Sequence, residues 1–212
     1  MNILWIEAEP NLCYSQVMAV VTENPAEGAF QLYTIANKEA VSPIPDSLDF
    51  EHAAVLPLAV STATVGLYTP QQLALPLPTL KAEPKNQVVL VWGGSSSVGG
   101  MTIQFAKLSG YKVAATCSPR NNDYVKSLGA DFVFDYSSPS IVDDIVNGLK
   151  DYEVAGIFNA IGGNIRNCMQ WCHFKSEDTY ISTTRRYRTS SAERHPSRRD
   201  SRSAGISCNN VL

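Results

Sequence analysis

The residues best suited to chemistry form a glycine- and serine-rich turn, residues 93–99, directly after a continuous apolar run. Glycine lets the backbone approach a ligand, and serine adds hydroxyl groups to the free amides. Where such a turn opens a helix, the unpaired N–H groups and the helix dipole attract phosphate. We therefore predict a dinucleotide diphosphate site, with an ordinary strand-to-helix loop as the alternative because the strict G-x-G-x-x-G pattern is absent. The predicted contacts come from Gly94, Ser95, Ser96, Ser97, Val98 and Gly99.

A second loop, residues 117–122, bears on which dinucleotide would bind. An acidic residue at this point would hold the ribose hydroxyls of NAD, whereas a basic or hydroxyl-rich loop suits the 2′-phosphate of NADP. The loop has no carboxylate before Asp123, and the Arg120 guanidinium offers a fork for phosphate. We therefore predict NADP(H), with a solvated surface arginine as the alternative reading of Arg120. Tyr136 could stack on the adenine or pack against this loop.

The elements around these loops alternate between strands and helices. Residues 87–92 are apolar throughout, as a strand buried on both faces requires, and residues 98–108 repeat apolar side chains at helical spacing. Further strands are predicted at 112–117, 132–135 and 154–159, with helices at 121–128 and at 139–149 capped by Ser138. This alternation predicts an α/β fold with a doubly wound parallel sheet, a partial Rossmann domain.

The segment before residue 87 has a different pattern. Residues 11–41 place short apolar stretches, including 16–21 and 28–35, between turn residues, which is typical of short antiparallel strands. Ser47 or Asp49 can cap a short helix, and residues 58–68 suit a buried helix. Four prolines between residues 69 and 84 exclude a helix or central strand, so we expect a linker there.

Composition limits the classes of function. The net charge of −3 argues against general binding to nucleic acid or to an anionic membrane, and no apolar run approaches the ~20 residues of a membrane span. Seven of the nine arginines lie in residues 185–212, so we predict a basic, disordered tail at 183–212. A nucleic-acid-binding arm is the alternative, although no aromatic residues accompany the arginines. Five scattered cysteines favour reduced thiols and a cytoplasmic location.

Two further groups are considered as sites. Cys168, Cys172 and His173 lie close in sequence, but no fourth ligand is near, so ordinary helix packing is favoured and no metal site is predicted. His52 stands alone beside a short helix, where a structural role is commoner than that of a general acid. No catalytic residue is assigned from the sequence.

Several motifs taken in order resemble a known family, the zinc-independent medium-chain dehydrogenases/reductases. More narrowly, they are similar to the fungal trans-acting enoyl reductases that serve polyketide synthases, and to zinc-binding-dehydrogenase-like proteins. The motifs lie at residues 44–48, 53–58, 93–99, 118–121, 128–131 and 134–136.

The resemblance implies a domain plan and a set of contacts. Residues 1–66 would be the remnant of a GroES-like β domain with a connecting helix, 67–86 a proline-rich linker and 87–182 a partial NADP-binding Rossmann domain, before the tail at 183–212. The 2′-phosphate would meet Ser118, Pro119, Arg120 and Asn121, the diphosphate the turn at 95–98, and the adenosine Tyr136. The substrate cleft would be lined by Leu58, Ala59, Val60, Ser61, Thr62, Ala63, Thr64 and Val65.

The activity that the resemblance implies is hydride transfer from NADPH to the β-carbon of an activated double bond. The substrate would be a small enoyl or enone compound, free or carried on a polyketide synthase. Compared with the family, the chain is expected to lack most of the catalytic domain and the last strands of the sheet. Exposed apolar faces would follow, and an inactive remnant or a non-catalytic nucleotide-binding module is the alternative function.

Overall fold

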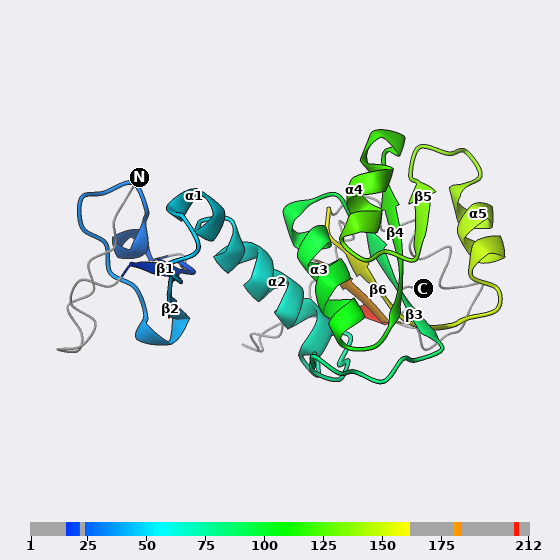
Figure 1. Cartoon of the computed structure of the whole chain (residues 1–212), viewed down its shortest axis with the longest axis horizontal. Helices are drawn as coiled ribbons and strands as arrows, with labels where there is room; N and C mark the ends of the chain where they lie inside the picture. The colour runs from blue at the N-terminus through cyan, green and yellow to red at the C-terminus, as the bar shows by residue number, and fades with distance from the viewer. Residues whose placement is uncertain (1–15, 22–23, 162–179, 184–205, 208–212) are drawn as a thin grey trace, which may run out of the picture. The chain divides into compact units, whose positions relative to one another are not determined.

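The computed structural model describes residues 16–21, 24–161, 180–183 and 206–207. The chain divides into two compact units, residues 1–61 and 62–212, and each is described by itself. Figure 1 shows their helices and strands along the chain.

The first unit contains a small antiparallel ribbon. Strand β1 (Val17–Ala19) pairs with β2 (Val41–Pro43), and two single 3-10 turns, η1 (Pro25–Glu27) and η2 (Lys38–Ala40), lie between them. The strand expected at residues 28–35 is wrong: these residues form bends and a loop without strand pairing. A strand needs a hydrogen-bonded neighbour, and in the described part of this unit β1 pairs with β2 alone.

The short helix α1 (Phe50–Ala53) begins where the sequence predicts. Asp49 is its N-cap, because the carboxylate accepts a hydrogen bond from the His52 amide at 2.9 Å. The same carboxylate lies 2.6 Å from His52 Nδ1. Both hydrogen bonds lower the pKa of Asp49, and the bond from the His52 backbone amide has the larger effect. His52 thus contacts its own helix cap, as the structural interpretation of this histidine expects.

Helix α2 (Leu56–Tyr68) begins two residues before the predicted start. Ala59, Ala63 and Leu67 recur every four residues and are buried, which makes one face of the helix. Together with α1 it forms a 19-residue stretch, Phe50–Tyr68, with a mean hydropathy of 1.3, long and apolar enough to cross a membrane by length and composition. Core helices of soluble proteins have the same composition, so this property alone does not establish a membrane span.

The second unit is built on a sheet with the order β5-β4-β3-β6-β7-β8. Its strands are β3 (Gln87–Trp92), β4 (Lys112–Cys117), β5 (Phe132–Asp135), β6 (Glu153–Asn159), β7 (Tyr180–Thr183) and β8 (Ile206–Ser207). Every pair from β5 to β7 is parallel, and β8 is antiparallel to β7. The doubly wound parallel sheet is confirmed. Ile206–Ser207 forms a strand inside the segment predicted to be a disordered tail; most of that tail lies outside the described residues.

Helices cover both faces of this sheet. Alternate side chains of β3 separate into two cores: Val89 and Val91 pack with residues of α3 (Ser97–Leu108) and α4 (Asn122–Ser127), whereas Val88, Leu90 and Trp92 pack with α5 (Ile141–Gly148). Figure 1 shows the three helices around the strands. Burial on both faces explains why β3 is apolar at every position after Gln87.

The start of α5 differs from the expectation. The helix begins at Ile141 with Ser140 at the N-cap position, not at Pro139 after a Ser138 cap. The physical reason is the Asp144 carboxylate, which accepts hydrogen bonds from the hydroxyls of Ser138 at 2.9 Å and Ser140 at 3.1 Å. These serine hydroxyls donate to a side chain of the first turn and do not accept from the helix amides.

The proline-rich segment at 69–86 forms no helix or strand, as expected. It is nevertheless packed onto the second unit, because Leu73 and Leu75 are buried in the same core as Val89 and Val91. Leu73 lies against Gly156 of β6, where an added Cβ would come within 2.7 Å of Leu73 Cδ2. The leucines between the prolines therefore belong to the core of the sheet domain.

The Asp131 side chain, just before β5, links this strand to β4 and α3. Asp131 accepts a hydrogen bond from the Val113 amide at 2.7 Å and lies 3.0 Å from Lys107 Nζ. Asp131→Ala leaves that amide unpaired, so we expect the free energy of unfolding to fall by about 1–3 kcal/mol in urea titrations. Asp151→Ala, at an exposed turn position, is the control and should change little. Equal stability of the two variants would contradict this role.

Candidate functional site

The turn after β3 is held in one conformation by its own hydrogen bonds. Gly93 has a φ of +85°, which favours glycine, and its carbonyl accepts bonds from the Ser96 amide at 3.0 Å and the Ser96 hydroxyl at 2.8 Å. The same hydroxyl is the N-cap of α3 and accepts from the Gly99 amide at 3.0 Å. Ser96 therefore shapes the turn, and its side chain already has partners.

Three backbone amides in the turn and at the start of α3 indicate a candidate anion site. Within the described residues, the N–H groups of Ser95, Ser97 and Val98 have no hydrogen-bond acceptor. Ser97 is exposed, and Ser95 and Val98 are partly exposed, so the bend is not covered by other described chain. No acidic residue lies in the first turn of the helix. The arrangement suits a phosphate group, which would accept hydrogen bonds from these amides.

Gly99 allows the helix to approach the turn. A Cβ at this position would lie 2.2 Å from the Gly93 carbonyl oxygen, a backbone atom that cannot move without breaking the turn. Gly99 is thus required by close approach of two backbone segments. Its amide is capped by Ser96, so it contributes space and not a free donor.

The second predicted loop, after β4, presents a free cation. Arg120 is exposed, and no ion pair joins it to another described residue. It lies in η3 (Pro119–Asn121), a 3-10 turn stabilised by bonds from the Asn121 amide to the Ser118 carbonyl at 2.9 Å and from Asn121 Nδ2 to Ser118 Oγ at 3.1 Å. These bonds hold the loop that carries Arg120 in one conformation. An exposed guanidinium on a fixed loop fits a 2′-phosphate.

The predicted site residues after β4 and β5 come together at one edge of the sheet. The Tyr136 amide lies 3.4 Å from the Cys117 carbonyl, so Tyr136 follows β5 directly beside the loop after β4. Tyr136 is 45% exposed, so the residue is accessible to a ligand. Hydrogen bonds from the Ser137 hydroxyl and amide lower the pKa of Asp135, and burial, followed by the Asp135 charge, raises the pKa of Cys117. Cys117 is therefore a buried neutral thiol.

Three residues that sequence reasoning missed lie beside the turn. The Thr116 hydroxyl accepts from the Gly93 amide at 3.1 Å, and an added Cβ on Gly93 would come within 2.7 Å of Ile161 Cγ2. Asn159 is fully buried at the end of β6, in register with Trp92. The signal available in the sequence was a polar side chain near the end of two apolar strands, Thr116 in KVAATC and Asn159 in VAGIFN.

The predicted substrate stretch, residues 58–65, lies wholly on α2. Its side chains differ in exposure to solvent: Ala59 and Ala63 are buried, whereas Leu58 and Val65 are exposed. The boundary between the two units falls after Ser61, within this stretch. The assignment to a substrate cleft stays a prediction.

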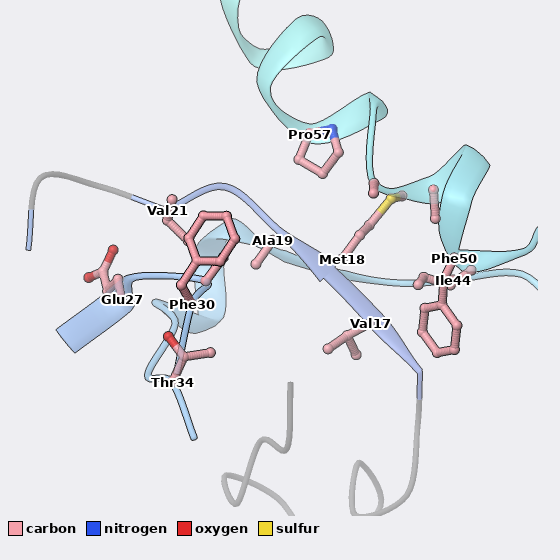
Figure 2. A pocket seen from close by; sticks show the side chains of 13 residues that line it. Val17, Met18, Ala19, Val21, Glu27, Phe30, Thr34, Ile44, Phe50 and Pro57 are labelled. Carbon is pink, nitrogen blue, oxygen red and sulfur yellow. The ribbon is translucent and has the colours of Figure 1, made fainter. Parts of the chain in front are cut away.

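A separate apolar pocket of about 370 Å³ lies within the first unit. Figure 2 shows it around β1, with Met18, Phe30, Phe50 and Pro57 among the side chains that line it. Two apolar side chains of this unit are strongly exposed: Phe30, which also lines the pocket, is fully accessible, and Leu32 is 90% exposed. The pocket contains none of the predicted cofactor residues.

No group of three or more His, Cys, Asp or Glu side chains that could hold a metal ion occurs among the described residues. Cys168, Cys172 and His173, which were weighed as ligands, lie outside the described residues.

The second unit has the α/β fold, with a parallel sheet covered by helices on both faces, that is found in the nucleotide-binding domains of dehydrogenases. In agreement, the zinc-binding dehydrogenase family matches residues 97–177. The dehydrogenase azaJ of Aspergillus niger is 47% identical over 142 residues, which are 67% of this chain and 41% of that protein. The trans-enoyl reductase tazE of Aspergillus terreus is 48% identical over 127 residues, or 60% of this chain and 41% of that protein. The chain thus spans about two fifths of the length of these relatives.

Solved structures show the same fold. A putative NADPH:quinone reductase from Bacillus thuringiensis superposes with a TM-score of 0.64 at 20% identity, covering 83% of this chain and 49% of that one. The CurK enoyl reductase superposes with a TM-score of 0.55 at 23% identity, covering 68% and 40%. The similarity to fungal dehydrogenases and trans-enoyl reductases, together with the shared fold, agrees with the resemblance of the sequence motifs to the medium-chain dehydrogenases/reductases.

Two neighbouring glycines of α3 provide a matched test of the turn. In Gly99→Ala the new Cβ overlaps the Gly93 carbonyl oxygen, so we expect a loss of about 1–3 kcal/mol in the free energy of unfolding. In Gly100→Ala the Cβ lies 3.1 Å from Leu128 Cδ1, the end of a side chain that can move, so the loss should be smaller. Urea denaturation measures both. The turn geometry would be refuted by a Gly99→Ala protein as stable as the Gly100→Ala protein.

Proposed function

We propose that this chain binds NADPH as part of an oxidoreductase of the enoyl reductase type. The observation that carries the proposal is a set of three amides, Ser95 in the turn and Ser97 and Val98 in the first turn of α3, that have no acceptor among the described residues. In open parallel sheets, ligands bind beyond the carboxyl ends of the strands where the strand order reverses, here between β3 and β6. The turn lies directly after β3.

The preference for NADPH over NADH rests on the loop after β4. In this proposal Arg120 pairs with the 2′-phosphate, while Ser118 and Asn121 hold the loop and add polar contacts. The nearest acid in sequence, Asp123, lies on α4 and is exposed. A carboxylate for the ribose hydroxyls of NAD is therefore absent from the described loop. Tyr136 would lie beside the adenosine.

The substrate proposed is a small compound with an activated double bond, an enone or an enoyl thioester. NADPH would supply the hydride, and the protein would supply binding, orientation and exclusion of water. The support is the similarity to proteins named trans-enoyl reductases. A polyketide synthase as carrier of the substrate, residues 58–65 as part of the cleft wall and a cytosolic location belong to the same proposal.

A second candidate function is that of a nucleotide-binding module without turnover. The observation that favours it is that the described site residues fit phosphate groups and none of them is assigned a catalytic role. Both candidates require NADPH binding, and only the first requires turnover. Oxidation of NADPH by this chain in the presence of 2-hexenoyl thioester or a simple enone, followed at 340 nm, separates them: saturable turnover supports the reductase, and binding without turnover supports the module.

Arg120→Ala tests the nucleotide preference. Because the variant loses a charge-assisted hydrogen bond to phosphate, NADPH affinity should fall by about tenfold to a hundredfold, while NADH affinity stays unchanged. Titration of NADPH and NADH fluorescence measures both constants. Lys126→Ala, which removes another exposed cation from the neighbouring helix α4, is the control. Equal losses for the two nucleotides in Arg120→Ala would exclude the proposed 2′-phosphate contact.

A further inference from the structure

Thr116 is a polar residue inside a strand that is otherwise apolar after its first position. It is fully buried in β4 and lies in register with Trp92, the last residue of β3. Its hydroxyl accepts a hydrogen bond from the Gly93 amide at 3.1 Å, and its carbonyl accepts one from the Gly94 amide at 2.8 Å. One residue of the neighbouring strand therefore holds the first two amides of the phosphate turn.

The opposite side of the same glycine is held by the turn itself. The Gly93 carbonyl accepts from the Ser96 amide and hydroxyl, and that hydroxyl caps the Gly99 amide. The Gly93 residue is thus fixed at its N–H by Thr116 and at its C=O by Ser96. Because Gly93 has a φ of +85°, in a region that glycine enters with little restraint, these bonds select one of many accessible conformations.

We propose that Thr116 is a positioning residue for the dinucleotide diphosphate: its hydroxyl fixes Gly93 and thereby directs the amides of Ser95, Ser97 and Val98 outward together. The inference rests on the proposed function and deepens it. A dinucleotide contacts amides that are already oriented, so it does not have to order the turn on binding. Thr116 also lies two residues before Ser118, and so joins the diphosphate turn to the loop proposed for the 2′-phosphate.

Replacing Thr116 by valine separates the effect of the hydroxyl group from the effect of side-chain volume. Valine has the shape of threonine and fills the same buried volume, but it leaves the Gly93 N–H without its acceptor. A residue that only fills space would tolerate this change, whereas a positioning residue would lose affinity for ligands that reach the turn. Serine keeps the hydroxyl and removes the methyl group, so Thr116→Ser should restore the affinity that Thr116→Val loses.

The test compares two ligands by calorimetry on the full chain. NADPH reaches the turn with its diphosphate, whereas adenosine 2′-monophosphate carries a 2′-phosphate and no 5′-phosphate. Thr116→Val should weaken NADPH binding by about threefold to tenfold and leave adenosine 2′-monophosphate within about twofold. Thr116→Ser should bind both ligands within about twofold of the unaltered chain. Arg120→Ala should differ from Thr116→Val, because it removes the proposed 2′-phosphate contact and so should weaken the binding of both ligands.

Amide hydrogen exchange of the unaltered, ligand-free chain adds a readout that needs no variant. The Gly93 amide should exchange more slowly than those of Ser95 and Ser97. Exchange of Gly93 as fast as these two, unchanged NADPH affinity in Thr116→Val, or a loss in Thr116→Ser as large as in Thr116→Val would each overturn the role of the hydroxyl. Failure of the unaltered chain to bind either ligand would instead overturn the proposed function, and the positioning role with it.

Discussion

The interaction on which the rest depends is the pairing of amides in the turn between β3 and α3. Gly93, Gly94, Ser96 and Gly99 each donate to an acceptor, while Ser95, Ser97 and Val98 have no acceptor among the residues that the structure describes. The split arises because a helix start leaves its first amides without intrahelical partners, and a single capping serine satisfies only some of them. The remaining donors lie at the edge of the sheet where the strand order reverses. The proposed diphosphate site rests on these donors.

The sheet keeps these donors in position. β3 is buried on both faces, with α3 and α4 on one side and α5 on the other, so the point at which it ends is rigidly placed. The loops after β4 and β5 follow the same edge because parallel strands end together. Cys117 and Tyr136 contact one another across this edge through the backbone. The glycine- and serine-rich turn, the loop that carries Arg120 and the Tyr136 ring thus follow neighbouring strands at one edge of the sheet.

Much of the nucleotide-binding domain could be predicted because its signals are local. Continuous apolar runs marked β3 and β4, and glycines marked the turn and the helix ends. The start of α5 could not, because it depends on a side-chain network around Asp144. The strand expected at 28–35 failed because pairing is not local: apolar alternation cannot show whether a neighbouring strand exists. Thr116 was missed since its role appears only when two strands are laid in register.

The most direct measurement of the central claim is the change in amide chemical shifts when NADPH is added to the ¹⁵N-labelled chain. We expect the amides of Ser95, Ser97 and Val98 to shift strongly and saturably, as they acquire phosphate oxygens as acceptors. The Gly93 and Gly94 amides, which already donate to Thr116, should shift less. Saturable NADPH binding that leaves the first three amides unperturbed would contradict the assignment of this turn as the diphosphate site.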